Sequence, residues 1–181
     1  MQTIEGDGRA AGYRFALVVS KYHEFITSRL QAAALAALSA AGAPSEGITI
    51  VRVPGAFEIP LAALHLAESG RYDAIICLGC LIQGETPHMG IIAAAVADGI
   101  AAASGATGVP ISFGVLTTNS MEEAEARAGE GPANKGQEAA IAAIEMASVV
   151  AQLTRPPAAP SKTTLSPGSP GSPGSPGSPG S

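Results

Sequence analysis

The chain has 181 residues, of which 46 % are apolar and 14 % charged, and its formal net charge is −5. This length is typical of one domain, and charges, Pro or Gly interrupt every long apolar stretch before the roughly 20 residues that a bilayer span needs. The acidic balance and the aromatic content of 4 % argue against a nucleic-acid partner. The first eight residues lack the basic region and apolar core of a secretory signal. We therefore expect a soluble, cytoplasmic protein with no nucleic-acid or membrane partner.

The carboxyl-terminal end has a composition unlike the rest of the chain. Its last sixteen residues, from Ser166, are five Ser-Pro-Gly triplets and a final Ser. Five triplets are too few for a collagen triple helix, and such a tract buries too little apolar surface to offset its ordering entropy. We therefore expect a folded domain at residues 1–154 and a disordered Pro/Gly/Ser-rich linker at 155–181, whose regularity is typical of an engineered linker.

Short, β-branched apolar runs alternate with segments of helical periodicity along the folded part. The predicted strands are 14–19, 48–53, 74–82 and 109–116. The predicted helices lie at 26–41, 59–69, from 87 onward, at 120–128 and at 135–153. This alternation implies right-handed crossovers between parallel strands. The expected fold is therefore a three-layer α/β sandwich, a four-stranded parallel core sheet with helices on both faces, of the flavodoxin-like kind.

The two cysteines have the C-x-x-C spacing of redox and zinc motifs. Both Cys77 and Cys80 fall inside one predicted strand, however, where residues three apart point to opposite faces of the sheet. We therefore favour two separately packed thiols. The sequence contains no metal-ligand cluster, Walker loop or dinucleotide fingerprint, so neither a metal nor a cofactor is expected.

Ligands of parallel sheets bind outside the carboxyl ends of the strands, beside the helix amino termini. The segments that follow the predicted strands are richer in polar and aromatic residues than the rest of the chain; they are 20–23, 54–58, 83–88 and 117–120. Tyr22, Phe57 and Phe113 lie near predicted strand ends, where they could clamp a planar ring, although any one of them could be a core residue.

The segment 84–88 is the most informative of these. Thr86 is a good helix N-cap, and Pro87 suits the first helical position. Gly84 allows close approach of the backbone, so the free N–H groups and the positive end of the helix dipole favour a phosphate. His88 falls in the first turn, where the dipole disfavours imidazolium, so the neutral ring could accept a proton. A plain helix start with an exposed histidine explains the spacing equally well.

Three charged residues are further candidates. Lys135 lies between Asn134 and Gln137, which form a capping-box pattern, and a lysine in a first turn opposes the helix dipole. This mild cost hints at a ligand, although solvated surface charge is the commoner role of Lys135 and of Arg127. Glu58 could bind a hydroxyl-bearing ligand or cap the second helix.

Five motifs combine in a specific order: VPGAFEIP at 53–60, GETPH at 84–88, SFGVLTT at 112–118, RAG at 127–129 and NKG at 134–136. Over roughly residues 2–153 the chain resembles the 6,7-dimethyl-8-ribityllumazine synthase family. The resemblance implies condensation of 5-amino-6-ribitylaminouracil with 3,4-dihydroxy-2-butanone 4-phosphate, a step of riboflavin biosynthesis that uses no cofactor or metal. It also implies a homo-pentamer with active sites between subunits, and in many members an icosahedral shell.

The resemblance implies a role for each matching residue. The implied substrate contacts are the ring-stacking Tyr22, the ribityl-binding Ala56, Phe57 and Glu58, the pyrimidine-contacting Leu81 and Ile82, and the phosphate-binding Gly84, Glu85, Thr86 and Arg127. His88 matches the residue proposed to transfer protons. Phe113 and Lys135 resemble residues that reach the site from the adjacent subunit.

The chain also departs from the family. After His88 the family usually has an aromatic residue, an acid and Tyr, whereas Met89, Gly90 and Ile91 stand here, and His23 replaces a usual Asn. Together with the Ser-Pro-Gly tract, these changes suggest an engineered pentamer or cage component with impaired catalysis. The alternatives are an enzyme, a self-assembling scaffold with weak or no catalysis, or a flavodoxin-like phosphate-binding module, which the combined motifs disfavour.

The Ala-rich helices carry few of the charges that a solvated helix face normally shows. Large apolar patches on soluble proteins usually mark interfaces, and a closed cyclic ring buries such faces without leaving an open edge. Together with the pentamer that the resemblance implies, this predicts a pentamer as the minimum unit; association into a larger shell and association with a designed partner stay open as alternatives.

Overall fold

The computed structural model describes residues 1–154; the predicted linker at 155–181 lies outside the described residues. The strands are β1 (Phe15–Ser20), β2 (Ile48–Val53), β3 (Ala74–Ile82) and β4 (Ile111–Thr118). The helices are α1 (Glu24–Ala40), α2 (Ile59–Glu68), α3 (His88–Thr107), α4 (Met121–Arg127) and α5 (Lys135–Thr154), with 3-10 turns η1 (Ser45–Gly47) and η2 (Ala56–Glu58). The strands form one parallel sheet in the order β2-β1-β3-β4.

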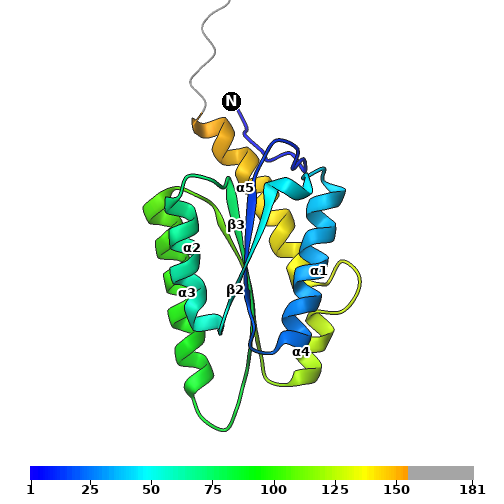
Figure 1. The fold of residues 1–181 in the computed structure, drawn as a ribbon, viewed down its shortest axis with the longest axis vertical. Helices are drawn as coiled ribbons and strands as arrows, with labels where there is room; N and C mark the ends of the chain where they lie inside the picture. Colours follow the sequence, from blue (N-terminus) through cyan, green and yellow to red (C-terminus); the bar gives the residue numbers. More distant parts are fainter. Residues whose placement is uncertain (155–181) are drawn as a thin grey trace, which may run out of the picture.

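The helices cover both faces of the sheet (Figure 1). The buried side chains of α2 and α3 share one cluster with Ala16, Ile75 and Cys77 of the strands. Those of α1, α4 and α5 form the other cluster, with Leu17 and Cys80. The predicted three-layer α/β sandwich is confirmed.

The central strands β1 and β3 are buried almost throughout, as their continuous apolar runs predict. Cys77 and Cys80 fall in different clusters on opposite faces, and both are free thiols. Burial raises the pKa of both, that of Cys80 to about 11. The prediction of two packed thiols is confirmed, since neither is exposed or ionised as a redox or metal-binding thiolate would be.

The fourth strand begins two residues later than expected. The β4 ladder starts where Ile75 pairs with Ile111, and Pro110 only accepts a hydrogen bond from the Ile75 N–H, at 2.9 Å. The strand then continues to Thr118, which pairs with Ile82. Thr117 and Thr118 therefore belong to the sheet and not to the loop after it.

The two helical layers are packed differently. Between α1 and α5 the backbones touch, since a Cβ at Gly136 would lie 2.1 Å from the carbonyl oxygen of Leu30. The amino-terminal segment also lies against α5, where the Asp7 N–H donates to Ser148 Oγ and Gln152 Nε2 donates to the Glu5 oxygen.

On the other face, α3 packs on α2 and approaches it closely at Gly99, where a Cβ would meet Pro60 at 2.7 Å. Within residues 1–154, α3 is the one helix long and apolar enough to cross a membrane by length and composition. The sequence analysis did not predict this, because it treated charges and glycines such as Asp98 and Gly99 as interruptions. The mean hydropathy of α3 stays high in spite of them. Only 17 % of its apolar window is buried, so this layer of the α/β fold has an apolar face that the chain itself does not cover.

Candidate active site

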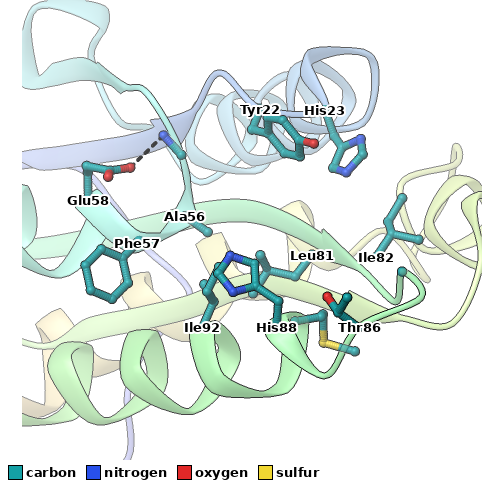
Figure 2. Close-up of a pocket in the computed structure, with 13 residues that line it drawn as sticks. Tyr22, His23, Ala56, Phe57, Glu58, Leu81, Ile82, Thr86, His88 and Ile92 are labelled. Atoms are coloured by element: carbon teal, nitrogen blue, oxygen red, sulfur yellow. Dashed lines mark hydrogen bonds between the residues drawn. The ribbon is translucent and has the colours of Figure 1, made fainter.

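A cavity of about 530 Å³ opens at the carboxyl ends of β1, β2 and β3. Its lining residues are Tyr22, His23, Gly55, Ala56, Phe57, Glu58, Leu81, Ile82, Gly84, Thr86, His88, Met89 and Ile92 (Figure 2). Three segments far apart in the sequence thus meet at one site, because the strands that precede them are neighbours in the sheet.

The segment after β2 forms one wall of this cavity. Glu58 Oε2 accepts a hydrogen bond from the Gly55 N–H at 2.8 Å, which closes the η2 turn (Figure 2). Phe57 is 62 % exposed at the cavity rim. The carboxylate of Glu58 therefore caps the η2 turn and not α2, whose N-cap position has no side-chain hydrogen bond. Glu58 also lines the cavity, and its binding of a hydroxyl-bearing ligand stays a prediction.

The loop after β3 is held by a residue that the sequence analysis missed. Gln83 Nε2 donates to the carbonyl oxygens of Gly84 at 2.7 Å and Thr86 at 3.1 Å. The prediction that Thr86 caps α3 is wrong, because Pro87 occupies the cap position and α3 begins at His88 with no side-chain cap. The Thr86 side chain faces the cavity instead (Figure 2). An amide side chain directly after a buried strand was the available signal.

Two histidines line the cavity from different elements. Figure 2 shows Tyr22 and His23, at the start of α1, on one side, and His88 and Thr86 on the other. The rings of Tyr22 and His23 meet edge to face, with centroids 4.5 Å apart and an interplanar angle of 67°. Burial lowers the pKa of His23. The sequence analysis did not assign His23 to the site, although a polar ring directly after a strand end pointed to it.

Met89 and Ile92 also line the cavity without having been predicted. Ile92 lies one helical turn after His88, and residues four apart share a face of a helix. This spacing was therefore a usable signal for Ile92.

Comparison with known proteins now identifies the family. A family model described as 6,7-dimethyl-8-ribityllumazine synthase matches residues 12–151. A 6,7-dimethyl-8-ribityllumazine synthase from Desulfatibacillum aliphaticivorans is 48 % identical over 149 residues, covering 82 % of this chain and 96 % of the relative. The chain belongs to the 6,7-dimethyl-8-ribityllumazine synthase family. An enzyme of the same name from Syntrophus aciditrophicus (strain SB) is 51 % identical over 154 residues, covering 84 % of this chain and 100 % of the relative. The expected enzyme class, a transferase that forms 6,7-dimethyl-8-ribityllumazine in riboflavin biosynthesis, is confirmed.

The lumazine synthase residues expected from an adjacent subunit lie apart from this cavity. Phe113 and Lys135 line a second cavity of about 260 Å³ between β4 and α5. Lys135 Nζ is 2.5 Å from Glu138 Oε2. Phe113 pairs with Cys77 in the first half of β4, so its expected position near a strand end is wrong, while its ring-clamping role stays a prediction.

Two phosphate contacts expected of a lumazine synthase, Glu85 and Arg127, do not line the cavity either. Arg127 ends α4, and its Nη1 donates to the carbonyl oxygen of Glu123 at 3.3 Å. The predicted N-cap of α5 at Asn134 is confirmed, since Asn134 Oδ1 accepts hydrogen bonds from the N–H groups of Gly136 and Gln137.

In residues 1–154, no group of three or more His, Cys, Asp or Glu side chains could hold a metal ion.

Proposed function

We propose that the cavity between Tyr22 and His88 is the part of the active site in which this chain condenses 5-amino-6-ribitylaminouracil with 3,4-dihydroxy-2-butanone 4-phosphate. The observation that carries this proposal is the convergence of three strand ends on one cavity, which brings together nine of the residues assigned by the family resemblance. They are Tyr22, Ala56, Phe57, Glu58, Leu81, Ile82, Gly84, Thr86 and His88.

The proposed binding mode follows the chemistry of the cavity walls. Tyr22 offers an aromatic face for the pyrimidine, and the apolar ends of Leu81 and Ile82 complete that side. Ala56, Phe57 and Glu58 receive the ribityl chain, whose hydroxyls suit a carboxylate acceptor. The phosphate lies at the start of α3, where Gly84, Glu85 and Thr86 present backbone at the positive end of the helix dipole. Arg127 approaches it from outside the cavity.

His88 is the proposed proton-transfer residue. The attacking amine loses its two protons as the carbon–nitrogen double bond forms, and the carbonyl oxygen gains them and leaves as water. The phosphate leaves as inorganic phosphate when its carbon–oxygen bond breaks, and closure of the second ring releases a second water. An imidazole at the first position of α3, facing the cavity, can accept and return such a proton. Proton transfer of this kind typically contributes about 10²–10⁴-fold to the rate. Holding the two substrates together supplies the remainder.

The two cavities support a site shared between subunits. One cavity lies at the carboxyl ends of β1 to β3, and the other lies at the edge strand β4 with Phe113 and Lys135. A head-to-tail ring would bring the second cavity of each subunit to the first cavity of its neighbour, and such a ring closes by rotation. We therefore keep the homo-pentamer, in the cytoplasm, as the proposed unit. Further closure into an icosahedral shell is the extension of this proposal.

A scaffold with weak or no catalysis is the second candidate. The observation that favours it is Met89, which lines the cavity beside His88 where the family usually has an aromatic residue. Gly90 follows in the first turn of α3, where a Cβ would meet nothing within 4 Å. An engineered component selected for assembly would retain the ring while tolerating such changes near the chemistry.

The deciding experiment combines turnover with the oligomeric state. Steady-state kinetics with both substrates should show lumazine formation, and His88→Ala should lower kcat by about 10²-fold or more with a smaller change in KM. His65→Ala, on the exposed side of α2, is the matched control and should leave kcat unchanged. Sedimentation should give a pentamer or a multiple of it. A pentamer without turnover supports the scaffold, while a monomer or dimer contradicts the shared site.

A further inference from the structure

His23 has an unusual backbone conformation. Within residues 1–154 it is the one residue other than glycine with a positive φ, at φ 55° and ψ 48°. This left-handed conformation is sterically unfavourable for residues with a Cβ, although Asn, Asp and His adopt it more readily than others. His23 stands at the N-cap of α1, and its carbonyl oxygen accepts hydrogen bonds from the N–H groups of Ile26 and Thr27.

The side chain of His23 takes no part in capping. The N-cap position of α1 has no side-chain hydrogen bond, so the imidazole is not retained for the role that N-cap residues usually play. The ring lines the cavity instead and meets the ring of Tyr22 edge to face. Within the part of the chain that the structure describes, this is the one aromatic pair. Burial lowers the pKa of His23, which favours the neutral imidazole in this contact.

Tyr22 has little else than the contact with His23 to fix the orientation of its side chain. Its side chain is 65 % exposed, and the hydrogen bond that fixes it locally joins its backbone N–H to Ser20 Oγ at 3.2 Å. An exposed ring with free rotamers loses conformational entropy when a ligand immobilises it. A neighbour that already holds the ring reduces that loss at the binding step.

We propose that His23 is a positioning residue that holds the ring of Tyr22 in the orientation that stacks on the planar heterocycle. The left-handed turn brings the imidazole into edge-to-face contact with the phenol ring at the cavity (Figure 2). This inference rests on the proposed function, from which it takes the stacking role of Tyr22. The Asn usual in the family lacks a ring, so the edge-to-face contact is a feature of this chain.

The test is a double-mutant cycle with 6,7-dimethyl-8-ribityllumazine as the titrated probe. Asn tolerates the left-handed conformation, so His23→Asn removes the ring while keeping the backbone. Edge-to-face pairs correspond to about 2- to 12-fold in an equilibrium constant, and we expect His23→Asn to weaken the probe by that amount. In the Tyr22→Ala background the same change should alter the Kd less than about 1.5-fold.

Three comparisons separate positioning from a structural effect. Tyr22→Phe keeps the stacking ring and should retain the sensitivity to His23→Asn. His65→Asn, on the exposed side of α2, should change neither affinity nor turnover. In steady-state kinetics, His23→Asn should raise the KM for the pyrimidine substrate while kcat stays within about twofold, as loss of uniform binding requires.

A ligand-free measurement completes the test if Tyr22→Ala abolishes binding. The near-ultraviolet circular dichroism that Tyr22→Phe removes should also fall in His23→Asn. An unchanged signal, or equal effects of His23→Asn with and without Tyr22, overturns the positioning role while leaving the proposed function intact. A wild-type protein that neither binds the probe nor turns over contradicts the proposed function, and the positioning role with it.

Discussion

The α1–α5 contact and the amino-terminal half of α3 lie on opposite faces of the same sheet, and they differ in how closely the chain packs around them. Between α1 and α5 the chain packs backbone against backbone at Gly136. Around the start of α3, Gly90 faces open space and Ile91 is 67 % exposed. The chain's own backbone closes the first contact at that point. The second region leaves an apolar helix face and an open cavity, which we propose as surfaces for further subunits and for substrate.

The largest expected effect is that of Gly136→Ala. The added Cβ would lie 2.1 Å from the oxygen, 2.6 Å from the carbon and 2.7 Å from the Cα of Leu30. These are backbone atoms on the buried face of α1, so relief requires α1 and α5 to separate. We expect a loss of about 3 kcal/mol or more in the free energy of unfolding, at the upper end of overpacking effects. Chemical denaturation followed by circular dichroism measures it. A loss under about 0.5 kcal/mol would show that this face is not rigidly packed.

That close approach marks the limit of what the sequence predicts about the fold. Sequence pattern locates β2 and β3 at their observed bounds. Burial of β3 on both faces imposes a continuous apolar run, and β2 is a short run rich in β-branched residues. Gly136 shows no such pattern, since its role depends on how near another backbone comes. The start of β4 is misplaced for a related reason: Pro110 continues the apolar run but lacks the N–H that a ladder position uses.

The same distinction between local sequence pattern and long-range contact applies to the candidate site. Residues that directly follow strands, such as Tyr22 and Phe57, are predictable because parallel strands place their carboxyl ends at one edge. The loop conformation is not, because it depends on which carbonyl oxygens the Gln83 amide reaches, and its position after the strand does not specify them. Phe113 and Lys135 lie at a second cavity, and nothing local in the sequence indicates that a site is divided between two surfaces.

Arg127→Ala should have the next largest effect, and it tests whether residues outside the cavity serve it. Charge-assisted hydrogen bonds to phosphate correspond to roughly tenfold or more in affinity. We expect a phosphate-bearing substrate to weaken by about this factor while 6,7-dimethyl-8-ribityllumazine, which has no phosphate, keeps its affinity. Calorimetric titration of the two ligands makes the comparison. Arg71→Ala, whose guanidinium lies over Tyr72, is the matched control. Equal weakening of both ligands would remove Arg127 from the phosphate site.

Gly90→Ala is the counterpart of Gly136→Ala on the open face. A Cβ at Gly90 meets nothing within 4 Å, and Ala is favoured over Gly inside a helix by up to about 1 kcal/mol. We therefore expect a gain of about 0.5–1 kcal/mol in the free energy of unfolding, measured by the same denaturation. A loss in the assembled protein would instead show that a neighbouring subunit packs on this turn, which would sharpen the contrast between the two faces.

The smallest expected effect is a pH dependence of stability at the cavity wall, carried by His23. Burial lowers its pKa in the folded protein below the ordinary value of 6.5. Above pH 6.5 the imidazole is neutral in both states, so stability is fully present. As pH falls below 6.5, the unfolded chain binds a proton that the folded chain resists, so stability is lost until the folded state also protonates. The Tm of the wild-type protein should therefore decline more between pH 7.5 and 5.5 than that of His23→Asn.

His65→Asn, which alters an exposed histidine beside Glu68, serves as the control for removing one histidine. Parallel curves for the wild-type protein and His23→Asn would mean that the imidazole is solvated, and the cavity wall would then be as open as the first turn of α3.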